Sequence, residues 1–322
     1  MTAATGCGST AARSSAPPSS SPSAPAPPGS AAPSPSAAAP GHPALCGSRA
    51  AAPAITKVMV IWEENQSYRA IIGSPSAPYL NRVAAECGLA TDYSSATHPS
   101  LPNYLQATSG RSFARAPFDY DCSPGGSCSA LGPSIFSQEA SAGRQWRSYE
   151  ESMPSPCDPT TTDVYAARHN PAVYYPAVTA DCHRWDVPLG GPSAGALEQA
   201  VAAGSLPSLS VVTPNVLDDM HSGSVSRGDA WLARWLPVIT AGPDYQDGRL
   251  AIFIVWDEGS GSGNQPSHVP LLVLSRSTPA ATRVGAGLGE YSLLRACESL
   301  TGIPTYLGAA ATAPSLTGPF GL

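Results

Sequence analysis

Runs of apolar, largely β-branched residues recur along the chain at the length of buried strands. They cover residues 55–62, 206–215, 250–261 and 268–275. Each run is too short to cross a membrane. Near-continuous apolar character is typical of strands that are covered on both faces. These segments therefore predict the strands of a largely parallel central sheet.

Two segments between the predicted strands have helical spacing. In residues 76–88 the apolar positions recur every three to four residues, and Gly88 is expected to end the helix. Residues 226–239 place Trp231 and Trp235 four apart, and we interpret both as core residues that pack against the sheet. Alternating strands and helices predict an α/β domain, in which functional groups collect at the carboxyl ends of the strands.

The middle of the chain, residues 111–192, lacks this regular pattern and is rich in Gly, Pro and Cys. We expect an irregular, disulfide-pinned insertion that shapes a pocket. The short separations of Cys122 from Cys128 and of Cys157 from Cys182 predict two disulfides, while the remaining pairing stays open. The eight cysteines include no CxxC pair and no zinc-finger spacing, which argues against structural zinc and favours an oxidising compartment.

Residues 1–53 have almost no large apolar side chain and are predicted to form a disordered Ser/Pro/Ala-rich linker before a folded domain at 54–322. The first residues, MTAATGCGST, do not form a signal peptide as written. Cys7 followed by a Ser/Pro/Ala tract resembles the start of a mature bacterial lipoprotein, and an ordinary tail with an incidental cysteine is the alternative. We expect a secreted or cell-surface protein.

The charge of the chain argues against a nucleic-acid partner. Only 12% of residues are charged, the net charge is −6, and Lys57 is the single lysine. Without a basic stripe the chain is not expected to bind nucleic acid. We expect a monomer that contacts membranes only through a lipid anchor or a lipid substrate.

Oxygen-bearing side chains end two of the predicted strands. Glu64 and Asn65 follow the first strand, and Asp257 and Glu258 follow the strand that begins near residue 250. Carboxylates and amides delivered by neighbouring strand ends can converge on one hard divalent cation. Two solvated acidic turns are the alternative.

The stretch THPSLPNYL, residues 97–105, combines two hydroxyls, an imidazole and an amide on a stiff bend. Pro99 and Pro102 restrict the backbone around Ser100, so this serine is a candidate nucleophile. Asn103 could then donate a hydrogen bond to an oxygen on which charge develops. A turn that caps a helix beginning near Pro102 is the alternative, and Thr97 is the reserve nucleophile.

A third polar cluster, TPNVLDDMHSGSV, places His221 after a strand end beside Asp218 and Asp219. This histidine could bind a phosphoryl group as a cation or protonate a leaving alkoxide. A histidine in a surface loop, paired with an aspartate, is the alternative.

In their order along residues 55–308, these motifs resemble the phosphoesterase family that joins bacterial acid phosphatases with phospholipase C enzymes, a branch of the alkaline-phosphatase superfamily. The resemblance is greatest to secreted acid phosphatases described as phosphatidylinositol-3-phosphatases. It rests on EENQSY, THPSLPNYL, WRSYEESMPSPC, DDMHSGSV, WDEGSG and HVPLLVLS. The family implies an alkaline-phosphatase-like three-layer sandwich with a mainly parallel central sheet.

The resemblance also implies roles for particular residues. Ser100 matches the family nucleophile, Asn103 its partner and His221 a histidine that touches the phosphoryl group. The residues that match the family's metal site are Glu64, Asn65, Asp257 and Glu258. Oxygen ligands favour Ca²⁺ or Mg²⁺, and help from histidine would admit Zn²⁺ or Fe. Gln66 departs from the family, where many relatives have histidine, and the resemblance assigns no role to His169, His183 or His268.

The function predicted in this way is a metal-dependent phosphomonoesterase that works through a phosphoserine intermediate. It would be an acid phosphatase, and a phosphoinositide is one substrate that the resemblance suggests. Two alternatives stay open: a phosphodiesterase of the phospholipase C type, and a catalytically silent lipoprotein that binds partners at the cell surface.

Overall fold

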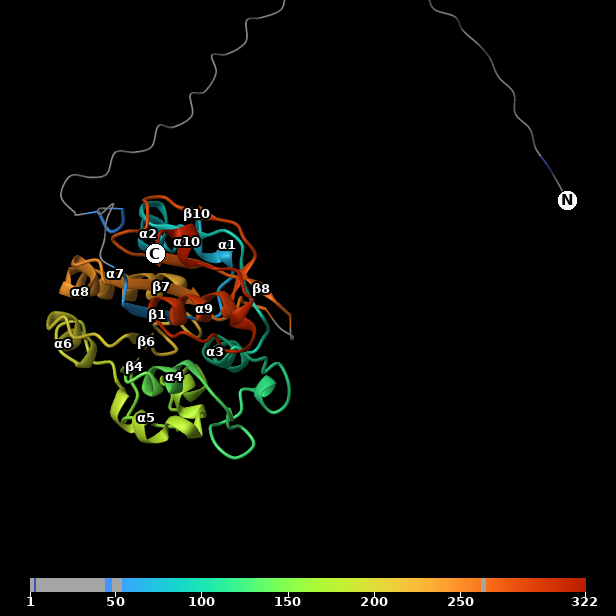
Figure 1. Cartoon of the computed structure of the whole chain (residues 1–322). Coiled ribbons are helices and arrows are strands. Elements are labelled where there is room, and N and C mark those ends of the chain that lie inside the picture. The colour runs from blue at the N-terminus through green and yellow to red at the C-terminus, as the bar shows by residue number, and fades with distance from the viewer. Residues whose placement is uncertain (1–2, 4–43, 48–53, 262–264) are drawn as a thin grey trace, which may run out of the picture. The chain divides into compact units, whose positions relative to one another are not determined.

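The computed structural model describes residues 3, 44–47, 54–261 and 265–322. Within these residues an eight-stranded sheet has the order β10-β2-β9-β7-β1-β6-β4-β5, and Figure 1 shows β4, β6, β1 and β7 side by side. In this order the strands are Arg283–Val284, Gly88–Ala90, Leu271–Leu274, Leu250–Trp256, Lys57–Glu63, Leu209–Thr213, Trp146–Glu150 and Asp186–Pro188. Only β9 runs antiparallel to its neighbours. A mainly parallel sheet was predicted, and the structure confirms it.

A second, small sheet has the order β11-β3-β8 in the described part of the chain. Its strands are Leu288–Gly289, Tyr93–Ser95 and Ser267–His268. The predicted strand at residues 268–275 is thus divided between β8 and β9. Pro270, which cannot donate a backbone hydrogen bond, lies between the two strands.

Helices cover both faces of the central sheet. Successive side chains of a strand point to opposite faces, so neighbouring residues of β1 meet helices on different sides. Trp62 of β1 packs on Tyr104 of α3, with ring centroids 4.7 Å apart. The next residue, Glu63, interacts electrostatically with Asp229 of α7 on the other face. The helices on the Trp62 side that contact one another are α3 Ser100–Ser109, α4 Ile135–Ser141 and α9 Glu290–Leu300. Those on the α7 side are α2 Pro78–Glu86, α6 Ala196–Ala202, α7 Val225–Ala241 and α8 Pro243–Gln246.

Trp231 and Trp235 of α7 are both buried, as predicted. The helix predicted over residues 76–88 is α2, and it ends at Glu86, so that Gly88 begins β2 instead of ending the helix. The shorter helices are α1 Tyr68–Ile71, α5 Thr179–Trp185 and α10 Thr317–Phe320. Single 3₁₀ turns cover Phe118–Tyr120, Ala167–His169, Pro171–Tyr174, Pro176–Val178 and Gly308–Ala311.

The middle segment, residues 111–192, is more regular than predicted. It contributes α4, β4, α5 and β5, and β4 lies inside the central sheet between β6 and β5. The sequence of β4, WRSYE, gives no apolar run, because its buried Ser148 and Glu150 satisfy one another by a 2.8 Å hydrogen bond. The two predicted disulfides, Cys122–Cys128 and Cys157–Cys182, are both present.

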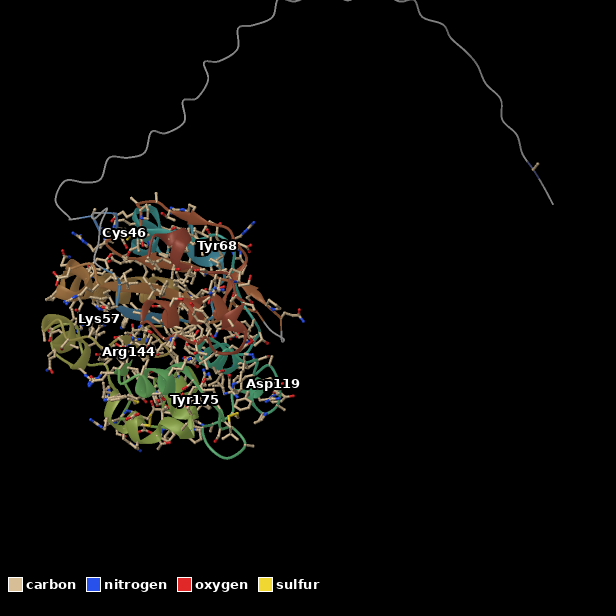
Figure 2. All side chains as sticks on the ribbon, in the orientation of Figure 1. Cys46, Lys57, Tyr68, Asp119, Arg144 and Tyr175 are labelled. Carbon is tan, nitrogen blue, oxygen red and sulfur yellow. A yellow bond between two sulfur atoms is a disulfide. The ribbon has the colours of Figure 1, made fainter. Side chains whose placement is uncertain are left out.

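A third disulfide joins Cys46, labelled in Figure 2, to Cys87 at the end of α2. The carbonyl oxygen of Leu45 also accepts a hydrogen bond from the hydroxyl of Tyr245. Residues 44–47 are therefore fixed to the folded domain, although they fall within the predicted linker. The rest of the linker, including Cys7, lies outside the described residues apart from Ala3.

Among the described residues, Cys297 is a free cysteine and is buried. The helices in this part of the chain are all too short, or not apolar enough, to traverse a bilayer.

Lys57, also labelled in Figure 2, forms a 2.7 Å ion pair with the buried Asp244.

Candidate active site

The acidic groups of β1 and β7 meet at one edge of the sheet. These strands are adjacent and parallel, with Glu63 opposite Trp256, so the next residues, Glu64 and Asp257, leave the sheet together. The backbone N–H of Asn65 donates to Oδ1 of Asp257 over 3.3 Å. Glu64, Asp257 and Glu258 each offer an oxygen, and these oxygens lie within 4.8 Å of one another.

Ser100 is the first residue of α3, and it lies against these carboxylates. Its Oγ is 3.2 Å from Oε2 of Glu64 and 3.3 Å from Oε1 of Glu258. The serine is only 1% exposed, so its hydroxyl has no alternative partner in bulk water. The structure thus brings the predicted nucleophile and three of the predicted metal ligands into one cluster.

Asn103 holds the bend that precedes Ser100. Its Oδ1 accepts from the N–H of Thr97 over 3.1 Å, and its Nδ2 donates to the carbonyls of Thr97 and Pro99 over 2.9 and 3.4 Å. Both amide hydrogens are therefore taken up by the backbone, which differs from the predicted direct contact with a substrate oxygen. The helix begins at Ser100 rather than near Pro102, so the bend is both a helix start and the support of the candidate nucleophile.

His169, to which the resemblance assigned no role, completes the buried side of the cluster. Its Nε2 is 3.1 Å from Oε1 of Glu64, and its Nδ1 is 3.2 Å from Oδ2 of Asp219. The hydroxyl of Tyr104 donates to the same Glu64 oxygen over 2.7 Å. Only Asp219 had a sequence signal, as a neighbour of His221. His169 comes from the irregular middle segment, and Tyr104 from inside the opening motif.

His221 lies on the outer side of the cluster, next to an arginine that the sequence did not single out. Nη2 of Arg168 is 3.1 Å from Nε2 of His221, and Nδ1 of His221 is 3.0 Å from Oγ of Ser222. A guanidinium can only donate, so Nε2 of His221 accepts and the ring is neutral. Burial, together with Arg168 and His98, lowers the pKa of His221 to about 4. Arg168 is therefore the cation beside this ring, and the role of His221 toward a phosphoryl group stays a prediction.

The carboxyl groups of the cluster carry more negative charge than their surroundings compensate. Burial, followed by repulsion from Asp257, Asp219 and Glu258, raises the pKa of Glu64 well above its usual value. Burial also raises the pKa of Asp257 to about 7, and burial with the charge of Asp257 raises that of Glu258 to about 10. A bound cation would remove this penalty.

Several buried ligand atoms in the cluster have no hydrogen-bond partner among the described residues: Oδ2 of Asp257, Oε2 of Glu258 and Nε2 of His169. Oε2 of Glu258 is nevertheless 2.8 Å from Nδ1 of His98. These atoms approach one another without hydrogen-bond geometry, as expected of ligands that face an ion. Burial lowers the pKa of His169, which favours the neutral ring that binds metals. The donor set fits a divalent cation.

A second group of possible ligands shares Glu64 with the first and adds His169 and His221. A third group, formed by Cys157, Cys182 and Asp186, is not a metal site, because its cysteines are joined in a disulfide. The candidate metal centre is therefore confined to the polar cluster around Glu64, within the part of the chain that the structure describes.

The model of the phosphoesterase family matches residues 74–302, which is more than half of the chain. The chain belongs to the phosphoesterase family. A phosphatidylinositol-3-phosphatase of Mycobacterium tuberculosis is 31% identical over 273 residues, which are 84% of this chain and 85% of that relative. The family predicted from the motifs is thus confirmed.

Two fungal relatives of the chain are less similar. An acid phosphatase of Aspergillus fumigatus is 24% identical, and the match covers 80% of this chain and 57% of the relative. A phosphate-repressible acid phosphatase of Penicillium chrysogenum is also 24% identical, with 78% and 60% covered. The chain therefore spans little more than half of the length of these fungal proteins.

Solved structures establish the fold of this phosphoesterase. A protein of the alkaline phosphatase superfamily from Vibrio parahaemolyticus superposes with a TM-score of 0.56 at 12% identity, covering 87% of this chain and 76% of that one. A lipoteichoic acid synthase from Listeria monocytogenes gives a TM-score of 0.54, also at 12% identity, with 79% and 74% covered. The predicted alkaline-phosphatase-like fold is confirmed.

Proposed function

We propose that this protein is a metal-dependent phosphomonoesterase that transfers the phosphoryl group of its substrate to Ser100. The observation that carries the proposal is the contact of one buried hydroxyl with two carboxylates of a cluster that fits a divalent cation. The family and the phosphatases among its relatives support the reaction class.

The residues that would hold the cation are Glu64, Asn65, Asp257 and Glu258. The side-chain N–H of Asn65 points to Oε2 of Glu64 over 3.3 Å, which leaves its amide oxygen as a ligand atom. A divalent ion bound there would neutralise the carboxylates and stabilise the negative charge that develops around the phosphorus. Its identity, Ca²⁺, Mg²⁺, Zn²⁺ or Fe, is part of what the experiments below test.

In the first step Oγ of Ser100 attacks phosphorus while its proton passes to Glu64 or Glu258, the two carboxylates in contact with it. The bond from phosphorus to the ester oxygen breaks, and that oxygen keeps the electron pair. Transfer of the same proton to this oxygen releases a neutral alcohol. Water then attacks the phosphoserine, the Ser100 oxygen regains a proton, and inorganic phosphate leaves.

Three further residues would orient these groups. Arg168, held 3.1 Å from His221 and 3.5 Å from Asp121, provides a cation for the non-bridging oxygens of the phosphoryl group. Neutral His221 keeps Arg168 in place. Asn103 acts on Ser100 through the bend that it ties together, so we assign it a positioning role.

We also propose that the protein is exported and that a phosphoinositide is among its substrates. The three disulfides within the described residues support an oxidising compartment. The similarity to the mycobacterial phosphatidylinositol-3-phosphatase supports the substrate. A lipid anchor at Cys7 remains a proposal from the sequence.

The test is release of inorganic phosphate from p-nitrophenyl phosphate by the full chain, before and after chelation and with metals added back singly. We expect activity that chelation removes and one or more metals restore. Ser100→Ala should lower kcat/KM at least about 10³-fold, as loss of a nucleophile does in other enzymes. Ser109→Ala is the matched control, because Ser109 lies buried at the other end of the same helix, where its Oγ donates to the carbonyl of Leu105 and accepts from the N–H of Arg111.

Three outcomes would contradict the proposal. Full activity of Ser100→Ala would move the nucleophile to Thr97. Activity that survives chelation would remove the metal. Cleavage of phosphatidylcholine to diacylglycerol without hydrolysis of monoesters would favour the phospholipase C alternative.

A further inference from the structure

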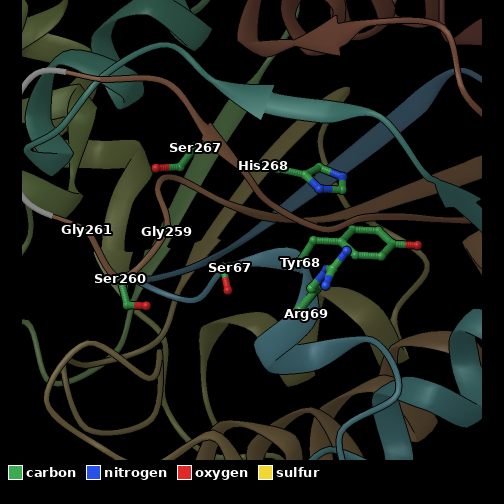
Figure 3. Close-up of a pocket in the computed structure, with 8 residues that line it drawn as sticks. All are labelled: Ser67, Tyr68, Arg69, Gly259, Ser260, Gly261, Ser267 and His268. Carbon is green, nitrogen blue, oxygen red and sulfur yellow. The ribbon is translucent and has the colours of Figure 1, made fainter. Parts of the chain in front are cut away.

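A cleft of about 310 Å³ opens beside the carboxylate cluster. Its walls include Ser67, Tyr68 and Arg69 from the segment after β1, Gly259 and Ser260 from the segment after β7, and His268 of β8 (Figure 3). A volume of this size falls at the lower end of the range for small-molecule sites. No role has so far been given to any of these side chains.

The walls of the cleft continue directly into the catalytic cluster. Gly259 follows Glu258, and Ser67 lies two residues after Asn65. The two segments touch, because a Cβ added to Gly259 would lie 3.6 Å from Cα of Ser67. The third wall, β8, pairs with β3, which leads into the bend before Ser100. A phosphate ester seated at Ser100 therefore has this cleft next to it.

The side chains of the cleft are suited to a hydroxylated, anionic group. The rings of Tyr68 and His268 are stacked with centroids 4.4 Å apart and an interplanar angle of 10°, and Figure 3 shows them face to face. A hydrogen bond of 3.1 Å between Nε2 of His268 and the carbonyl of Thr91 holds the pair in place. The rings thus form a wall of fixed shape, beside the hydroxyls of Ser67 and Ser260.

Arg69 adds an uncompensated positive charge. Its side chain is exposed, and it forms no ion pair or hydrogen bond with any residue that the structure describes. Other arginines of this region have partners: Arg82 lies over the ring of Tyr79, with its guanidinium carbon 4.9 Å from the centroid. A guanidinium without a partner among the described residues can bind an anion in this cleft through charge-assisted hydrogen bonds.

We propose that this cleft binds the alcohol part of the phosphate ester, and that Arg69 selects esters whose alcohol is a polyol ring with a second phosphate. The inference rests on the proposed phosphomonoesterase activity, because it assigns the leaving-group side of that site. A soluble polyol bisphosphate and a lipid headgroup share this chemistry, and the experiment separates them.

The experiment compares kcat/KM of the full chain for inositol 3-phosphate and inositol 1,3-bisphosphate. The wild type should favour the bisphosphate about tenfold, through a lower KM, because the second phosphate reaches Arg69. Arg69→Ala should lose this preference and Arg69→Lys should keep part of it. Arg82→Ala, which removes an exposed arginine from the neighbouring helix, should behave as the wild type.

Equal treatment of the two substrates by the wild type, or an equal loss on both in Arg69→Ala, would overturn the inference. Binding is measured separately by calorimetry with Ser100→Ala and with the double variant Ser100→Ala/Arg69→Ala. If the wild type hydrolyses no monoester, the proposed function fails. Tighter binding of the bisphosphate by Ser100→Ala than by the double variant would still support the cleft, and equal binding would overturn it too.

A final arm presents phosphatidylinositol 3-phosphate in phosphatidylcholine vesicles beside the soluble bisphosphate. An Arg69-dependent preference for the vesicles identifies the second phosphate as the diester of a lipid headgroup. An Arg69-dependent preference for the soluble compound alone identifies the substrate as a free polyol bisphosphate. Loss of the Arg69 effect in both forms would contradict the assignment.

Discussion

Two groups of buried carboxyls lie on strands of the same sheet, and their surroundings differ. Glu150 ends β4 and Asp186 begins the neighbouring β5. Oε1 of Glu150 accepts from Ser148 and Thr213 over 2.8 and 3.2 Å, and Oδ2 of Asp186 accepts from Asn170 over 2.8 Å. At the ends of β1 and β7, the carboxyls of Glu64, Asp257 and Glu258 converge instead on one another.

The difference separates a structural carboxyl pair from a ligand cluster. Oε1 of Glu150 and Oδ2 of Asp186 meet neutral donors from neighbouring side chains, while Oδ1 of Asp186 has none among the described residues, and burial raises the pKa of both carboxyls. The Glu64 cluster leaves Oδ2 of Asp257 and Oε2 of Glu258 without hydrogen-bond donors. What distinguishes the cluster is that three such carboxyls converge, because neither burial nor a missing donor alone marks a functional carboxylate: both oxygens of the buried Glu63 also lack a donor.

The largest difference between the ligand cluster and the structural pair is expected in enzymatic activity. Asp257→Asn removes a charge from the ligand cluster and should lower kcat/KM for p-nitrophenyl phosphate by about 10³-fold, because a ligand and a stabilising charge are lost together. Asp186→Asn makes the same chemical change in the pair and should stay within about threefold of the wild type. Equal losses of kcat/KM in the two variants would contradict the distinction between the ligand cluster and the structural pair.

The next contrast concerns stabilisation by metal. A divalent cation at about 100 times its Kd should stabilise the wild type by about 2.7 kcal/mol, since it binds only the folded chain. Thermal unfolding of the chelated and the metal-loaded protein measures this shift. We expect Asp186→Asn to keep the shift and Asp257→Asn to lose it. A shift that persists in Asp257→Asn would place the cation elsewhere.

Asp186 should contribute to the pH dependence of stability, beside the contribution that the cluster carboxyls make in the absence of metal. Burial raises the pKa of Asp186 to about 7, from a usual value of 3.8. Between these values the folded chain holds a proton that the unfolded chain releases, so stability falls as pH rises. In metal-free protein, the urea concentration at half-unfolding should fall as the pH is raised from about 5 to about 7.5, and the fall should be smaller in Asp186→Asn. An identical drop in both proteins would exclude Asp186 as its source.

The smallest contrast compares two hydroxyl donors. Tyr104→Phe removes the hydroxyl that donates to Glu64, and Thr213→Val removes one that donates to Glu150. Each should cost about 1 kcal/mol of stability, as single buried hydrogen bonds do. Only Tyr104→Phe should also reduce kcat/KM, by about tenfold, because it orients a ligand. Reduced activity in Thr213→Val would link the two groups.

The same contrast explains what could be predicted from the sequence. β1, β6 and β7 are buried on both faces, so their apolar runs predict them directly. β4 could not be predicted in this way, because Ser148 and Glu150 are buried by pairing with each other. Among the site residues, Ser100 and the acidic pairs stand next to strand ends or on a Pro-rigidified bend.

The rest of the site is assembled by the tertiary structure. His169 and Arg168 come from a 3₁₀ turn in the irregular middle segment, where no periodicity indicates which side chains face the sheet edge. The charge state of His221 depends on Arg168, a contact between residues 53 positions apart. Local patterns predict strands and strand-end groups, whereas partners brought together by folding have to be observed.

The central claim is that Ser100 receives the phosphoryl group. The direct measurement is peptide mass spectrometry of the full chain after rapid acid quenching during turnover of p-nitrophenyl phosphate. We expect one phosphoryl group on the peptide that contains Ser100, and in Ser100→Ala no phosphoryl group and no turnover. A phosphoryl group on Thr97, or undiminished turnover in Ser100→Ala, would contradict it.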